Sequence, residues 1–274
     1  PGSEFEVQGR TITDTLEIDG EFTFPSEDGT NGQVMQTDGS GNVTWETLSS
    51  SASTALADTD NDTKIQVEES ADEDIIRFDI AGTEYFRMDS GRIQVLNTGN
   101  SVFLGNNAGL NDDLTTNNNT FVGSSAGQTN SSGANNSFYG YASGQLGSTG
   151  NSNSFFGANA GKATTTSSDN TFMGAGTGQS NTTGGNNTFY GAGAGTSTAT
   201  SNDNTMLGRY AGNANVSGAQ NVYVGSSAGQ NNTSGSGNVM LGHQAGQNES
   251  GSNKLYIDNS SASTPLIYGD FAND

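Results

Sequence analysis

The stretch Asn-Thr-Phe-Tyr-Gly-Ala-Gly-Ala-Gly, residues 187–195, is one copy of a phrase that occurs nine times between Ser101 and Gly246. Each copy has a polar residue, a small or β-branched residue, two apolar residues, and two glycines four positions apart. The first glycines are Gly105, Gly123, Gly140, Gly157, Gly174, Gly191, Gly208, Gly225 and Gly242. After a first step of 18 residues, every step is 17 residues. A period this strict is typical of a solenoid, in which each unit stacks on the next and none folds alone.

Both central positions of the phrase are apolar in every copy, although neighbouring side chains of a strand point to opposite faces. The first position is occupied by Phe103, Phe121, Phe138, Phe155, Phe172, Phe189, Met206, Tyr223 and Met240. The second is occupied by Leu104, Val122, Tyr139, Phe156, Met173, Tyr190, Leu207, Val224 and Leu241. A 17-residue coil has room for two short strands and two turns, which enclose one column only. We therefore expect copies of the chain to cover the other column, in a homotrimer or by pairing of rolls.

A column of asparagines precedes the apolar pair, at Asn119, Asn136, Asn153, Asn170, Asn187, Asn204, Asn221 and Asn238. Side-chain amides stacked about 4.8 Å apart hydrogen-bond from coil to coil, as in other stacked strands. The paired glycines permit the positive φ of a tight corner. We therefore interpret both features as structural and not as ligand sites.

The fold class predicted is all-β: a parallel β-roll or β-helix of nine 17-residue coils at residues 99–252, with an atypical C-terminal cap at residues 253–274. In the cap, Asn-Lys-Leu-Tyr-Ile-Asp (residues 253–258) resembles a repeat strand. Its connector is expected to be two residues short, with Ile257 in place of the glycine.

The N-terminal part is expected to hold a β-rich stem at residues 6–50 and a β-meander shoulder at residues 51–98, which a linker or short helical turn at 49–57 precedes. The turn residues at 38–42 predict a hairpin. Residues 1–5 include Gly-Ser-Glu-Phe, which resembles translated cloning sites, so this segment is interpreted as a vector remnant.

Composition excludes several classes of function. The net charge is −21 with only eight Lys and Arg residues, which disfavours nucleic acid and anionic membrane surfaces as partners. There is no cysteine, so disulfides and thiolate metal sites are excluded. No apolar run approaches the roughly 20 residues of a transmembrane helix, so no membrane insertion is expected. Apolar residues make up only 30% of the chain, which by itself favours disorder, but the repeat places them in register.

One segment carries a candidate metal site. Asp58, Asp60, Asp62 and Glu69 occupy positions 1, 3, 5 and 12 of a possible EF-hand loop, with Ile65 at position 8. Thr63 stands where such loops have glycine, and the residues after it alternate like a strand. Calcium is therefore the one cofactor indicated, and a solvated turn that leads into a strand is the alternative.

Signals for catalysis are weak. His243 is the only histidine, and it lies in a repeat turn, where an exposed turn residue is expected. Asp72, Glu73 and Asp74 could be imagined as the carboxylates of a glycosidase, but an acidic loop before a strand explains them. The prediction is that the chain is not an enzyme.

The phrase Asn-Thr-Phe-Val-Gly-Ser-Ser-Ala-Gly, residues 119–127, resembles the repeats of bacterial and phage fibre proteins. The resemblance implies an architecture similar to the heads of trimeric autotransporter adhesins, in which three left-handed parallel β-rolls pack together. Those heads have shorter repeats and fewer bulky aromatics than this chain. The stem stretches at residues 28–39 and 62–69 are also similar to fibre proteins of marine and Bacteroidetes-type bacteria.

These features together predict a homotrimeric fibre fragment for attachment or receptor binding: an adhesin, or the tail fibre of a phage or a phage-like contractile injection particle. Its expected place is extracellular, on a bacterial or particle surface, with a cell-surface glycan or protein as receptor. The N-terminal stem is expected to join the remainder of the fibre or particle. The alternatives are a polysaccharide-degrading tailspike enzyme and a calcium-stabilised passive spacer.

Overall fold

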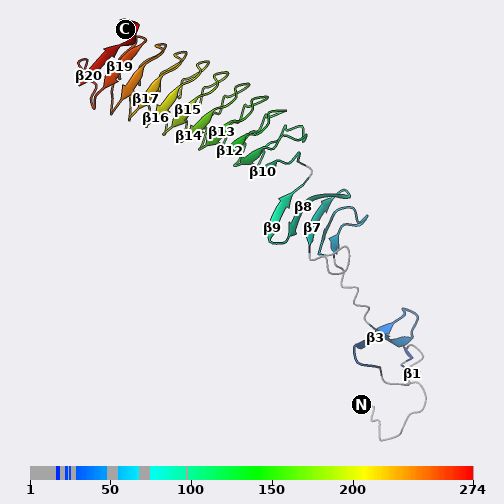
Figure 1. Cartoon of the computed structure of the whole chain (residues 1–274). Helices are drawn as coiled ribbons and strands as arrows, with labels where there is room; N and C mark the ends of the chain where they lie inside the picture. The colour runs from blue at the N-terminus through cyan, green and yellow to red at the C-terminus, as the bar shows by residue number, and fades with distance from the viewer. Residues whose placement is uncertain are drawn as a thin grey trace, which may run out of the picture.

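The computed structural model is all-β (Figure 1). It describes residues 17–18, 22–23, 25, 29–47, 55–67, 75–96 and 98–273. These residues form twenty strands and one short 3-10 helix, Phe271–Asn273. Half of the strands belong to one stack of coils, which we call the rod and which runs from Val102 to Ile257.

Nine strands of three residues form the repeated part of the rod, one in each coil. They are β10 (Val102–Leu104), β11 (Thr120–Val122), β12 (Ser137–Tyr139), β13 (Ser154–Phe156), β14 (Thr171–Met173), β15 (Thr188–Tyr190), β16 (Thr205–Leu207), β17 (Val222–Val224) and β18 (Val239–Leu241). Each pairs in parallel with the same positions of the next coil, so that Phe138 lies beside Phe155 and Phe155 beside Phe172. The predicted parallel β-solenoid of nine coils is confirmed.

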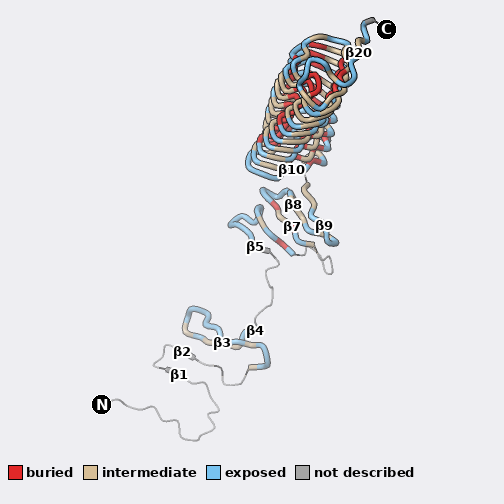
Figure 2. The backbone as a smooth tube through the Cα atoms, turned by 90° about the vertical axis from the view of Figure 1, so that its left-hand side faces the viewer, coloured by how far each residue is buried: buried red, intermediate tan, exposed pale blue. Residues whose placement is uncertain are grey.

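The interior of the rod is the first apolar column. Phe121, Phe138, Phe155, Phe172 and Phe189 are buried, and their rings stack with centroids 4.8 Å apart and interplanar angles of 6–8°. This spacing equals the distance between neighbouring strands, so each ring lies directly on the ring of the next coil. A column of buried small residues, including Ala160, Ala194 and Ala211, packs against the stack. Figure 2 shows that buried segments recur along the whole stack of coils.

The rest of each coil is irregular, but it is still bonded to its neighbours. The prediction of two short strands per coil is wrong, because the described coils have one strand each and continue as turns. The N–H groups of Gly161, Ala163 and Thr165 donate to carbonyls of the next coil at 2.9–3.0 Å. Buried backbone groups need such partners, and here they find them around the whole circumference.

The asparagine ladder is confirmed. The side-chain oxygen of Asn170 accepts from the backbone N–H of Asn187 in the next coil at 3.0 Å. Its side-chain nitrogen donates to the carbonyl of Gly184 at 3.0 Å, across the closing corner of its own coil. One side-chain amide therefore connects two neighbouring coils by a hydrogen bond and also closes its own coil.

Two glycines in each coil are required by geometry. Gly178 has a φ of 54°, and a Cβ there would lie 2.5 Å from the ring of Phe172. Gly174 has a φ of 135°, and a Cβ there would lie 2.7 Å from the backbone of Gly191. The repeat therefore keeps glycine where a side chain would collide with the stacked core or with the next coil.

The C-terminal end of the rod departs from the repeat. β19 (Lys254–Ile257) pairs in parallel with β18, and β20 (Ile267–Asp270) then pairs antiparallel with β19. Tyr256 lies beside Met240, so the last connector is one residue short and not two, as the sequence suggested. Asp258, and not Ile257, takes the place of the glycine. The reversed strand ends the parallel stack.

The N-terminal part has separate sheets. β1 (Glu17–Ile18) pairs with β2 (Phe22–Thr23), and β3 (Gln33–Thr37) forms an antiparallel pair with β4 (Val43–Thr47) around the predicted hairpin turn. The shoulder is a five-stranded antiparallel meander of β5 (Ala55–Ala57), β6 (Lys64–Gln66), β7 (Ile76–Ile80), β8 (Thr83–Asp89) and β9 (Arg92–Val95). Residues 55–57 were expected to be linker or helical turn, but they form the strand β5 because Leu56 pairs with Ile65.

Candidate functional site

The outer face of strands β10–β18 is the most extensive uniform surface of the rod. None of the 27 residues of these strands is charged, although the whole chain has a net charge of −21. Two columns point outward. One is the second apolar column, and the other begins with Val102 and Thr120. An uncharged strip of this length, on so acidic a chain, is typical of a surface that another molecule covers.

The two apolar columns differ as the strand geometry requires. Phe155 is completely buried, whereas its neighbour Phe156 is 36% exposed on the outer face. Tyr190 is 54% exposed. Tyr139 and Phe156 stack outside the coil with ring centroids 4.8 Å apart, in the same way as the rings inside. The prediction that one coil encloses only one column is confirmed, and the outer column is left open in the single chain.

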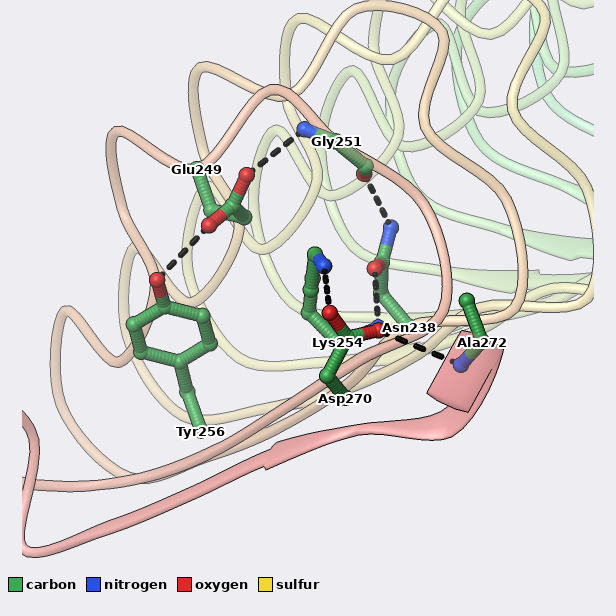
Figure 3. Close-up of polar contacts among 7 residues, drawn as sticks. All are labelled: Asn238, Glu249, Gly251, Lys254, Tyr256, Asp270 and Ala272. Carbon is green, nitrogen blue, oxygen red and sulfur yellow. Dashed lines mark hydrogen bonds and ion pairs between the residues drawn. The ribbon is translucent and has the colours of Figure 1, made fainter. Parts of the chain in front are cut away.

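The cap brings together polar groups that end the interior ladders of the rod (Figure 3). The oxygen of Asn238 accepts from the backbone N–H of Lys254 at 2.9 Å, so Lys254 takes the place of the next asparagine. Its ammonium group pairs with Asp270 of β20 at 2.6 Å. This bond raises the pKa of Lys254. Sequence reasoning missed the pair; the one signal for it was the break in the repeat at residue 253.

A second inner column of polar residues ends at Glu249. This residue stands one period after Asn232, in a column that also holds Asn215 and Thr198. Its carboxylate accepts from the hydroxyl of Tyr256 at 2.6 Å and from the N–H of Gly251 at 2.7 Å. Burial raises the pKa of Glu249, but these hydrogen bonds outweigh it, so the pKa lies below its ordinary value. Burial and the bond to Glu249 raise the pKa of Tyr256.

A shallow cavity of about 250 Å³ opens beside this pair. Its lining includes Glu249, Tyr256, Ser261 and Ser263. The carboxylate and hydroxyl in its wall are already bonded to each other, so the cap uses them to close the rod.

The candidate calcium ligands lie in the loop between β5 and β6. Asp58, Asp60 and Asp62 each bring a carboxylate oxygen within 4.8 Å of the others, on an exposed surface. The N–H of Thr63 donates to Asp58 at 3.2 Å and lowers the pKa of Asp58. Glu69 lies outside the described residues. The loop joins two antiparallel strands, so the flanks differ from those of an EF-hand, and calcium stays a prediction.

Of the residues considered for catalysis, the described part of the chain includes only His243. His243 is exposed in the turn after β18. Asp72, Glu73 and Asp74 lie outside the described residues. Within the described part of the chain, the titratable groups with shifted pKa values lie in turns, in the cap and, for Tyr223, in the buried inner column of the rod.

Comparison with known proteins gave no match: no family model, no curated protein and no solved structure is similar to this chain. Across the described residues, no helix is both long and apolar enough to cross a bilayer. The functional argument therefore rests on the geometry of the rod, the cap and the shoulder.

Proposed function

We propose that the chain is a structural segment of an extracellular fibre and works as a homotrimer that attaches a bacterial cell or a phage-like particle to a surface. The solenoid supports this role because its length grows by one strand spacing, about 4.8 Å, with each repeat, without any need for a larger core. The fibre is an adhesin or a tail fibre. Its mechanism is reach and display, not turnover.

The observation that supports the proposal most strongly is the uncharged outer face of β10–β18. The rod already bonds its backbone groups from coil to coil and buries its inner column, and on this face apolar side chains recur in every coil and gain from being covered. Three copies around an axis cover such a strip and leave no open edge. The connectors and the cap stay outside this contact and are the surfaces available to a glycan or protein receptor.

A trimer also explains how a fibre with weak individual contacts holds on to its receptor. Three identical sites at fixed spacing bind with an avidity that exceeds the affinity of each site, provided that the geometry allows simultaneous contact. The acidic surface keeps such a rod soluble and disfavours nucleic acid as a partner.

The test is the mass of the protein in solution, measured by light scattering on an eluting peak. We expect three times 28.0 kDa. Phe156→Asp places three charges in the proposed contact, so we expect it to give a folded monomer. Thr166→Asp, in an exposed connector of the same coil, is the matched control and should remain trimeric. A wild-type protein that elutes as a compact monomer would refute the proposal.

A further inference from the structure

The shoulder sheet separates its charged and apolar side chains onto opposite faces. The strands β6–β9 contain seven charged residues, and all of them lie on one face: Lys64, Arg77, Asp79, Glu84, Arg87, Asp89 and Arg92. They pair with each other there, as in Lys64 with Asp79 at 3.7 Å and Arg77 with Glu84 at 3.6 Å. This face therefore neutralises itself within one chain.

The opposite face is apolar across all five strands. Leu56, Ile65, Phe78, Phe86 and Val95 form one continuous cross-strand row. Ile76, Met88 and Ile93 form a second row beside it. Among the described strand residues, this face has no charged side chain.

This apolar face is open to solvent in the single chain. Leu56 is 78% exposed, Ile93 65% and Ile80 57%, although these residue types are usually buried. Only Phe78 and Phe86 shield each other, edge to face at 5.0 Å. An antiparallel sheet normally packs its apolar face on a core and turns its polar face to water. Here none of the described residues covers the apolar face, which is therefore available to another molecule.

We propose that the apolar face of the shoulder packs against the same face of the other copies of this chain, and so completes the interface that the rod begins. This inference rests on the proposed trimer. It goes further because it assigns a second, separate contact to a region that has no repeats.

The available area decides which partner fits. One strand residue covers about 16 Å² of sheet, from a rise of about 3.3 Å and a strand spacing of about 4.8 Å. The 27 residues of β10–β18 then offer about 430 Å², and the 22 residues of β5–β9 about 350 Å². A stable interface needs about 800 Å² from each partner, which neither surface reaches alone and both together approach. A foreign protein that bound the shoulder alone would have less than half of that.

The short connection between the rod and the shoulder is a second reason why other copies of this chain fit as the partner of the shoulder. β9 ends at Val95 and β10 begins at Val102, so only six residues separate the shoulder from the first coil. Once three rods lie side by side, their shoulders are tethered close together. A short tether of this kind gives an effective concentration on the order of millimolar, which makes a small apolar contact sufficient.

Cysteine cross-linking of the full chain tests this inference, because the protein has no cysteine of its own. Ile93→Cys places a thiol on the apolar face. Arg92→Cys is the matched control, since it is the adjacent residue, its side chain is 69% exposed, and it lies on the polar face. Each variant is treated with a short bismaleimide after its mass in solution and its circular dichroism have been measured. Leu56→Cys replaces Ile93→Cys if the latter does not fold.

The expected result is a trimer in which the apolar-face variant yields roughly tenfold more covalent dimer than the control, because tethered thiols react at a much higher effective concentration. A trimer whose two variants cross-link equally, or not at all, overturns this inference and leaves the proposed fibre intact. A monomeric wild type overturns both. The measured mass therefore separates the two failures.

Discussion

The rod and the shoulder are both made of short strands with one apolar face, but only the rod buries such a face by itself. In the rod, the inner column lies within a closed coil, and Phe155 and Phe172 are completely buried. In the shoulder, the sheet stays open, and Leu56 and Ile93 are more than half exposed. The difference shows that a 17-residue coil encloses a buried interior of its own. The open meander, with 22 strand residues, buries its apolar face only against a partner.

The same difference extends to polar groups. The rod bonds its column of interior asparagines through a ladder that repeats every 17 residues and ends on the backbone of Lys254. The shoulder pairs its charges on one surface and has no equivalent ladder among its described residues. We therefore expect substitutions in the rod interior to unfold the chain, and substitutions on the outer faces to separate its copies.

The largest effect is expected from Phe155→Asp. This change removes one ring from the stack and places a carboxylate among buried apolar groups, with a cost of at least about 4 kcal/mol. Because each coil contacts only its neighbours, melting should begin in the middle coils. Thermal unfolding followed by far-ultraviolet circular dichroism checks this, with Phe156→Asp as the comparison.

The two variants should lose different properties if one column is inside the coil and the other is outside. Phe155→Asp should lose secondary structure, and Phe156→Asp should keep it while losing the trimer. If both variants kept the melting temperature and mass of the wild type, the assignment of an inner and an outer column would be wrong.

A smaller but clear effect is expected from Asn170→Leu. It removes the oxygen that accepts from the N–H of Asn187, so this buried N–H is left without its partner, whereas the carbonyl of Gly184 keeps its bond from Asn181. One buried backbone group without a partner costs about 1–3 kcal/mol, so the loss of stability should lie in that range. Asn231→Ala, an exposed residue whose side chain has one bond, to Asn248, should cost less than about 0.5 kcal/mol. Equal melting temperatures for the two variants would show that the ladder does not stabilise the rod.

The repeat itself explains how much of this could be predicted. The strict step of 17 residues predicts the parallel register, the asparagine ladder and the glycine corners, because a stacked structure repeats each environment at each step. The number of strands per coil could not be predicted, since the polar connectors carry no pattern that distinguishes turns bonded from coil to coil from a second short strand. The spacing of Asp58, Asp60 and Asp62 predicts that their carboxylates lie close together. The same spacing does not predict whether they bind a metal ion.

The regions outside the repeat were predicted less well for a physical reason. The ion pair of Lys254 with Asp270 depends on the antiparallel return of β20 along β19. The 17-residue repeat does not predict this change of strand direction. The open shoulder face could have been found from the alternation of Ile76, Phe78 and Ile80, but the sequence alone does not show that no described element covers it. A missing cover becomes visible only in three dimensions.

The smallest effect on stability is expected in the cap, where ionisable groups follow the neutral polar side chains of the rod interior. The folded pKa of Glu249 lies below its ordinary value of 4.5, so this carboxylate stabilises the folded state above that pH. The contribution is lost as the pH falls through the lowered pKa, because the unfolded chain then binds more protons. Since this carboxylate is only partly buried, its contribution should be about 1 kcal/mol or less. The raised pKa of Tyr256 keeps its hydroxyl protonated as a donor up to pH values above 10.

The variant Glu249→Gln separates the contribution of this carboxylate to folding stability from that of the other carboxylates of the chain. The variant should melt below the wild type at pH 7, and the difference should shrink as the pH falls below about 4, where the wild-type carboxyl takes up its proton. Tyr256→Phe, which removes the donor and keeps the ring, should show the same convergence. A difference that stayed constant from pH 7 to pH 3 would mean that packing, and not the ionised bond, closes the end of the rod. The comparison would then sharpen, because the cap would be held by buried area, as the inner column of the rod is, and the ion pairs of the shoulder would have no counterpart in the cap.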